Sequence, residues 1–65
     1  MSLFMTSKKR EKINDEIDDL LMEQYYCRCR IEDATETQDE QSITHENAKI
    51  DEYELRIEKL RKKLR

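Results

Sequence analysis

The side chains best suited to chemistry in this chain are two cysteines and one histidine. Cys27 and Cys29 lie two residues apart in the segment LLMEQYYCRCR, and His45 is the single histidine. Thiolate and imidazole are the usual zinc donors, but zinc sites take their cysteines from C-x2-C to C-x4-C pairs with a second matching pair. This chain has no second pair, so four ligands would need two chains. A dimeric Cys/His metal site is therefore our third functional hypothesis.

The spacing of the cysteines favours a structural role. Residues two apart on a helix point about 200° apart, so Cys27 and Cys29 do not face one another. The C-x-x-C pattern of thiol redox motifs is absent. Cysteine also packs well as a small buried hydrophobe. We predict that Cys27 and Cys29 pack as small buried hydrophobes, with no metal and no cofactor.

Carboxylates are plentiful but do not indicate catalysis. General acid–base chemistry needs a titratable pair held close to its substrate in a suitable environment, and two helices offer no desolvated cleft of their own. His45, flanked by Thr44 and Glu46, is expected at the surface or at a helix cap. We therefore predict that the protein is not an enzyme.

Charge is segregated along the chain. Residues 31–46 hold six acids and neither Lys nor Arg, whereas both ends are basic. The possible polyanion contacts are Lys8, Lys9, Arg10, Arg61, Lys62, Lys63 and Arg65. Clustered cations suit phosphate contacts, but base recognition also needs aromatic residues or a known reading motif, and neither lies there. Nucleic-acid binding is therefore the alternative hypothesis.

Composition predicts a small all-α protein. The chain has 65 residues, of which 45% are charged and 35% apolar, with no Gly and no Pro to make turns. No apolar run is long enough for a membrane span, and the first residues lack the apolar stretch of a signal peptide. We expect an intracellular, reducing, cytoplasmic location. Residues 1–6 are expected to be a leader or a disordered N-terminus, with Met5 as the natural start.

Apolar residues recur with helical spacing in two stripes. The first is Ile13, Ile17, Leu20, Leu21, Gln24, Cys27 and Ile31, and the second is Ile43, Ile50, Tyr53, Ile57, Leu60 and Leu64. From Ile50 onward the second stripe has the 3, 4, 3, 4 spacing of a heptad seam. The stripes are roughly 120° out of phase, so one straight helix does not carry both.

The chain is therefore expected to reverse between the stripes. Thr35 with Gln38, and Thr37 with Glu40, have the spacing of capping boxes at a new helix start. We predict one antiparallel, coiled-coil-like hairpin domain over residues 7–65. Its parts are helix 1 at about 7–34, an acidic turn at about 35–37 and helix 2 at about 38–65. A continuous helical rod is the alternative.

A second apolar face on helix 1 leads to the functional hypothesis. Met22, Tyr25, Tyr26 and Cys29 lie nearly opposite the first stripe, and a helix that is apolar on both sides must be covered on both. We expect a homodimer, a four-helix bundle, acting as a regulatory adaptor that binds another protein. The predicted interface residues are Met22, Tyr25, Tyr26, Cys29, Ile50, Tyr53, Ile57, Leu60 and Leu64.

Overall fold

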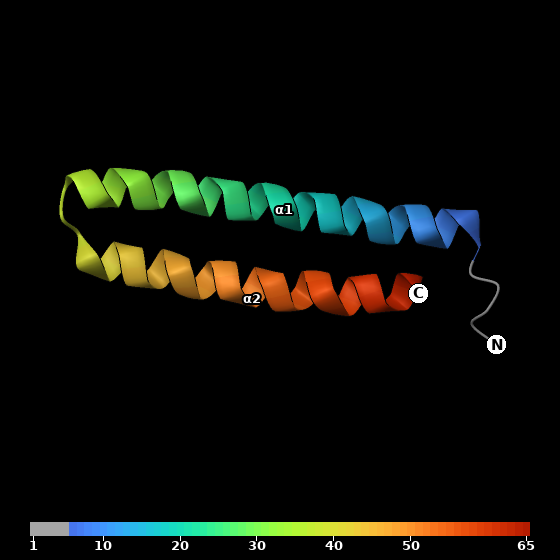
Figure 1. The fold of residues 1–65 in the computed structure, drawn as a ribbon. Coiled ribbons are helices and arrows are strands. Elements are labelled where there is room, and N and C mark those ends of the chain that lie inside the picture. Colours follow the sequence, from blue (N-terminus) through green and yellow to red (C-terminus); the bar gives the residue numbers. More distant parts are fainter. Residues whose placement is uncertain (1–5) are drawn as a thin grey trace.

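Two packed helices make up nearly all of the described structure. The computed structural model describes residues 6–65, in which α1 spans Ser7–Glu36 and α2 spans Glu40–Leu64. The helices lie side by side and run antiparallel, with the turn at one end and the start of α1 beside the C-terminus at the other (Figure 1). We call the latter the open end. The predicted all-α architecture is confirmed, and no strand occurs within residues 6–65.

The start of α1 is capped by a threonine. Thr6 is the N-cap, and its hydroxyl oxygen accepts a hydrogen bond of 3.2 Å from the amide of Lys9. Such a bond satisfies one of the amides that has no partner inside the helix. Of the leader expected at residues 1–6, only Thr6 belongs to the described residues; 1–5 lie outside them.

The end of α1 is a Schellman motif in which Gln38 takes the place usually held by glycine. Gln38 has a φ of 59°, in the left-handed region. Its amide donates to the carbonyl of Thr35 at 3.2 Å, and the amide of Asp39 donates to the carbonyl of Ala34 at 2.8 Å. These bonds satisfy carbonyls that would otherwise lack partners. The helix therefore continues to Glu36, two residues past the expected end, and reverses without glycine.

The predicted capping of helix 2 is wrong. Thr35 and Thr37 still belong to the end of α1, and their hydroxyls donate to carbonyls one turn back, at 2.7 Å and 3.2 Å respectively. This back-bonding competes with capping in Ser and Thr. The N-cap of α2 is instead Asp39, whose carboxylate accepts from the amide of Ser42 at 3.2 Å and from its hydroxyl at 2.6 Å. Both hydrogen bonds lower the pKa of Asp39, and the bond from the Ser42 hydroxyl contributes most.

The aliphatic core lies toward the open end. Its buried members are Ile13, Ile17 and Ile57, with Leu20, Leu60 and Leu64 packed against them. Burying an isoleucine side chain contributes about 1.5–3 kcal/mol. On the predicted seam of helix 2, Ile57 is buried, and the half-buried members are Ile50, Tyr53, Leu60 and Leu64. Leu21, which the pattern places on the stripe of helix 1, is 42% exposed, because the single helix α2 covers a narrower strip of α1.

Candidate interaction surfaces

An exposed apolar cluster lies on the side of α1 that faces away from α2. We call it the outer cluster, and its members are Met22, Tyr25, Tyr26 and Cys29. Exposure is 51% for Met22, 57% for Tyr25 and 45% for Tyr26, while Cys29 is half-buried. The two tyrosine rings meet edge to face, with centroids 5.9 Å apart and an angle of 64° between their planes. Edge-to-face contact is a favoured aromatic geometry, so the cluster is a packed surface.

The two cysteines lie on different sides of α1. Within the outer cluster, the neighbouring Cys29 side chain is the largest cause of the raised pKa of the Tyr25 hydroxyl. Cys27 is fully buried between the helices. Burial is the largest cause of the raised pKa of the Cys27 thiol, and contact with the Glu46 carboxylate is the next largest. Both thiols are free, and they do not share one site.

A partly buried ion pair joins the helices next to Cys27, with the Glu46 side chain 9% exposed and the Arg30 side chain 49% exposed. Arg30 Nε donates to Glu46 Oε1 at 3.0 Å, and Arg30 Nη2 donates to Cys27 Sγ at 3.3 Å. Burial alone would raise the pKa of Glu46, but the hydrogen bond from Arg30, the neighbouring Cys27 thiol and the charges of Arg30 and Lys49 lower this pKa overall. Glu46 is thus a carboxylate held in its charged form although only 7% exposed.

A second polar bond lies nearer the middle of the hairpin. Gln24 is buried, and its Nε2 donates to the backbone carbonyl of Ile50 at 3.0 Å. Within the described part of the chain, every buried side-chain nitrogen or oxygen has a hydrogen-bond partner. The contact between the helices is therefore aliphatic toward the open end and polar toward the turn.

The sequence pattern missed Glu46. Its position is three residues after Ile43 and four before Ile50, so it continues the heptad seam of α2 toward the turn. A charged residue at a seam position is buried only with a partner. The seam position therefore predicts a partner cation on helix 1 but does not say whether it is Arg28 or Arg30.

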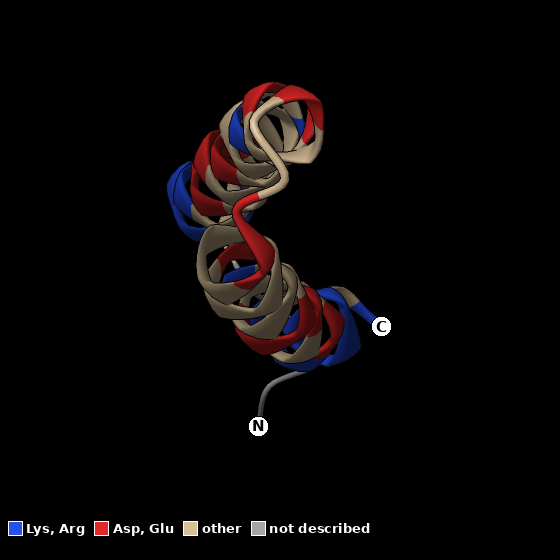
Figure 2. Ribbon diagram, turned by 90° about the vertical axis from the view of Figure 1, so that its left-hand side faces the viewer, with Lys and Arg blue, Asp and Glu red and all other residues tan. Residues whose placement is uncertain are grey.

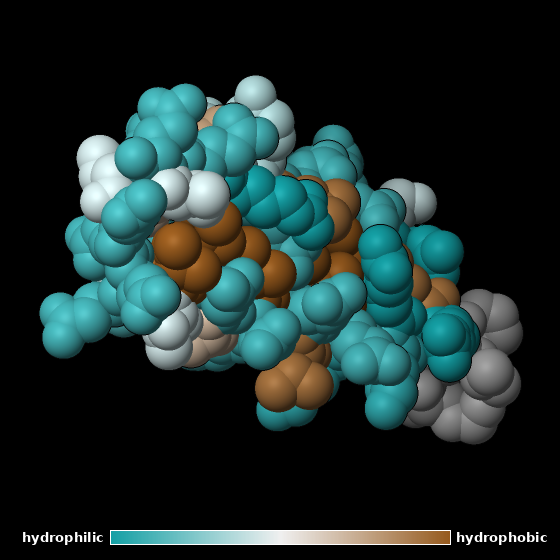
Figure 3. All heavy atoms as spheres, turned by 60° about the vertical axis from the view of Figure 1, so that its left-hand side comes forward, coloured by the Kyte–Doolittle hydropathy of each residue, from teal (hydrophilic) through white to brown (hydrophobic). Residues whose placement is uncertain are grey.

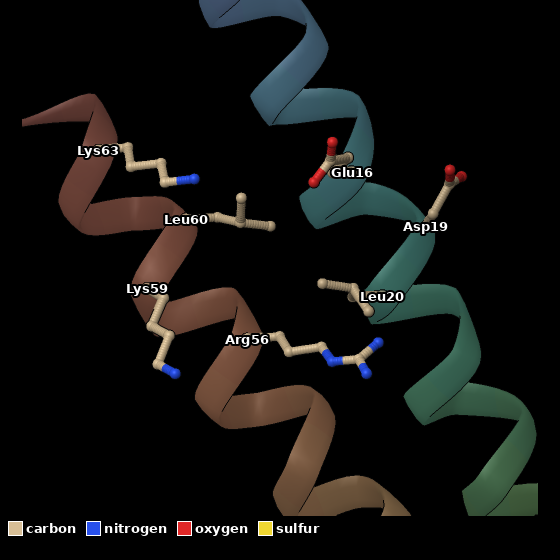
Figure 4. Close-up of a pocket in the computed structure, with 7 residues that line it drawn as sticks. All are labelled: Glu16, Asp19, Leu20, Arg56, Lys59, Leu60 and Lys63. Atoms are coloured by element: carbon tan, nitrogen blue, oxygen red, sulfur yellow. The ribbon is translucent and has the colours of Figure 1, made fainter.

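A groove with oppositely charged walls runs between the helices near the open end. It has a volume of about 380 Å³ and is lined by Glu16, Asp19, Leu20, Arg56, Lys59, Leu60 and Lys63. Leu20 and Leu60 point toward each other across it, and Lys63 extends toward Glu16 (Figure 4). The acids come from α1 and the cations from α2. No cysteine, serine or histidine lines this groove.

The open end brings the two basic runs of the sequence together. Arg10 Nη1 donates to the backbone carbonyl of Leu64 at 3.4 Å. A hollow of about 560 Å³ beside this contact is lined by Lys9, Lys12, Ile13, Glu16, Lys62, Lys63 and Arg65. Lys8 and Arg61 are exposed but do not line it. Viewed from the turn, the hairpin shows acidic segments nearest the viewer and basic segments around the C-terminus (Figure 2).

The possible metal ligands are dispersed. His45 is exposed on α2, Cys27 is buried between the helices, and Cys29 is in the outer cluster. Among residues 6–65, no three side chains of His, Cys, Asp or Glu are grouped so that they could hold a metal ion. Cys27 is fully buried and its Sγ accepts from Arg30 Nη2 at 3.3 Å, whereas Cys29 is half-buried and His45 is exposed.

Comparison with known proteins adds no relative. No protein-family model, no curated protein and no solved structure matches this chain. In the described part of the chain, neither helix combines the length and the apolar composition needed to cross a membrane. The arguments for function therefore come from the surfaces described above.

Proposed function

We propose that this protein is a small interaction protein, a helical hairpin that acts as an adaptor by binding another protein through the outer cluster. The supporting observation is the exposure of Met22, Tyr25 and Tyr26 on a helix whose opposite side is already packed against α2. Contiguous exposed apolar surface marks contact sites on proteins. Tyrosine suits such a surface because its ring packs while its hydroxyl stays in contact with water.

The test of this function uses a photoreactive side chain placed on the hairpin in cells that express it. Tyr26→p-benzoylphenylalanine is expected to crosslink to a partner upon irradiation, because the position lies within the outer cluster. The matched control is Leu55→p-benzoylphenylalanine, since Leu55 is 61% exposed but stands apart from this cluster, on the other helix. Absence of any adduct at position 26, or equal adducts at both positions, would contradict the proposal.

Self-association into a four-helix bundle is the second part of the proposed function. A chain of this size rarely buries enough apolar surface on its own. Ile43 and Ile50 lie two heptads and one heptad before Ile57, and both remain half-buried. On the face drawn in Figure 3, hydrophobic side chains form patches bordered by hydrophilic ones. A second hairpin stacked on the side of Leu21, which is 42% exposed, would cover apolar surface that α2 leaves open.

Mass action tests this association. If folding and association are coupled, the melting temperature rises with protein concentration. Leu21→Glu is expected to shift the sedimenting species toward monomer, whereas Leu55→Glu, which removes an isolated exposed leucine, leaves it unchanged. A monomer at all micromolar concentrations with a constant melting temperature would rule out the bundle.

Polyanion binding at the open end is a second candidate function. The observation that favours it is the hollow surrounded by cations from both helices, including Lys9, Lys62 and Arg65. Retention on immobilised heparin is expected to fall in the triple variant Lys62→Gln, Lys63→Gln, Arg65→Gln, because phosphate and sulfate contacts depend on clustered cations. Lys59→Gln is the control outside this hollow. Equal retention of the triple variant and the control would exclude this site.

A further inference from the structure

The outer cluster is the centre of a longer stripe on α1, and the flanks of that stripe are acidic. Residues three and four positions apart lie on the same face of a helix, so the stripe can be followed outward from Met22 and from Cys29 in such steps. The positions reached are Glu11, Asp15 and Asp18 on the N-terminal side, and Asp33 and Glu36 on the C-terminal side. All five carboxylates are exposed. No Lys or Arg occupies a position of this stripe between Glu11 and Glu36.

The hairpin does not neutralise these flanks. The ion pairs within residues 6–65 are Arg30–Glu46 and Arg56–Glu52, and neither involves a carboxylate of the stripe. The outer face of α1 therefore presents a short apolar centre between two negative ends. A partner helix of about 16 residues or more that is centred on this cluster also reaches Asp18 and Asp33, because a helix advances about 1.5 Å per residue.

A second copy of α1 is a poor occupant of this face. In an antiparallel pairing centred between Tyr25 and Tyr26, Asp18 would face Asp33 of the copy, and Asp15 would face its Glu36. A parallel pairing in register would place every carboxylate opposite itself. Like charges placed together across an interface cost free energy and suppress that pairing. This argues against the second copy that the sequence pattern places on the outer cluster.

We propose that the outer face of α1 docks an amphipathic helix of another protein, with apolar residues at its centre and Lys or Arg one and two turns to either side. The inference rests on the proposed function and names the chemistry of the partner. The apolar centre of that helix would pack on Met22, Tyr25 and Tyr26, the helix-on-surface mode in which apolar anchors recur every three or four residues. Its cations would face Asp15, Asp18, Asp33 and Glu36, which would speed association and fix the register.

The experiment uses a synthetic helical peptide of about 22 residues, long enough to span both acidic flanks. The peptide carries leucine at the positions that face the outer cluster and lysine at those that face the flanking carboxylates. A matched peptide has glutamate in place of each lysine. Calorimetric titration of the full chain is expected to show binding of the basic peptide at least about tenfold tighter than binding of the acidic one. Raising the salt from about 0.05 M to about 0.5 M should weaken it.

Variants of the full chain separate charge from apolar contact. The quadruple variant Asp15→Asn, Asp18→Asn, Asp33→Asn, Glu36→Gln should lose about tenfold in affinity for the basic peptide. The double variant Glu54→Gln, Glu58→Gln removes exposed acids of α2 and should lose nothing. Tyr26→Glu should abolish binding, while circular dichroism shows that the helices persist.

Two results would overturn the inference. The first is the absence of a charge effect. It would appear as equal affinity of the native chain for the two peptides, or as equal affinity of the native chain and the quadruple variant for the basic peptide. The second is no binding of the basic peptide while position 26 crosslinks to a second copy of the chain, which would leave the proposed interaction function in place with a different occupant. If position 26 also gives no crosslink, the proposed function fails together with the inference.

Discussion

Arg30 Nε lies 3.0 Å from Oε1 of Glu46, and this ion pair connects the two helices in the half of the hairpin nearest the turn. Glu46 occupies a seam position of α2, so sliding one helix past the other by a turn would bury its carboxylate without a cation. Removing Arg30 would leave the Glu46 carboxylate buried without its cation, which is destabilising, whereas the half-exposed Arg30 can be solvated by water. We infer that the pair specifies the register of the hairpin as well as supporting its fold.

The lowered pKa of Glu46 predicts acid sensitivity. Because the folded state holds this pKa below its ordinary value of 4.5, ionised Glu46 adds stability at higher pH, and this part is lost as the pH falls through the folded-state pKa. Urea unfolding at a series of pH values should therefore show a smaller acid-dependent loss in Glu46→Gln than in the native chain. The variant should also be less stable at neutral pH.

Glu52→Gln is the matched control for this prediction. Glu52 pairs with Arg56 at 3.2 Å on the exposed surface of α2, four residues away on the same helix. Exposed pairs of this kind contribute little to stability. Its acid profile should therefore match that of the native chain. If Glu46→Gln and Glu52→Gln give the same profile, the Arg30–Glu46 pair does not stabilise the fold.

Gln38→Gly is expected to stabilise the hairpin. Gln38 adopts a φ of 59°, a conformation that is unfavourable for a residue with a Cβ atom by about 1 kcal/mol and free of that penalty for glycine. For a chain of this size, the melting temperature should rise by roughly 5 °C. Glu36→Gly, which places the glycine inside α1, should lower it by a similar amount. A drop in both variants would contradict the Schellman geometry of the turn.

The sequence predicts the two helices well because their signals are repeated many times. The seam from Ile50 to Leu64 offers five apolar positions in heptad spacing, and no single residue decides the outcome. The structure of the turn, in contrast, depends on which of two alternative hydrogen bonds or backbone conformations a few individual residues adopt. A threonine hydroxyl can cap the next helix or donate to a backbone carbonyl of the preceding turn. The sequence around Thr35 and Thr37 is compatible with both. A left-handed Gln38 has no sequence signal, because glycine is the usual marker of that conformation.

The candidate surfaces were predictable where they depend on helical phase. The angular positions of the residues around helix 1 are enough to assign the outer cluster and the stripe that contains Cys27 to different sides of the helix. These positions do not say how wide a strip α2 covers, which is why Leu21 remains partly exposed. They also do not pair charges between helices, so the contact of Arg30 with Glu46 required the register of the fold.

The two cysteines should differ in reactivity toward an aromatic disulfide reagent. Cys27 is fully buried, and burial raises its pKa, so the reactive thiolate is scarce and inaccessible. Cys29 is half-buried beside Tyr25 at the surface. Absorbance should show one fast thiol and one slower by about a hundredfold or more, because the slow one waits for opening of the hairpin. Cys29→Ser should remove the fast phase and Cys27→Ser the slow one, whereas equal rates would place both thiols at the surface.

The seam of α2 is tested by Ile57→Lys. Ile57 is 4% exposed and packs with Ile13 and Ile17. Even truncation to alanine at such a position costs about 3 kcal/mol, and a lysine there adds an unpaired charge in the only aliphatic cluster of the described hairpin. A domain of this size has a total stability of only about 5 kcal/mol, so Ile57→Lys should abolish the cooperative melt seen by circular dichroism. Lys59→Ala, two residues away on an exposed part of α2, should melt like the native chain. Identical melts for Ile57→Lys and Lys59→Ala would mean that the seam does not pack against α1.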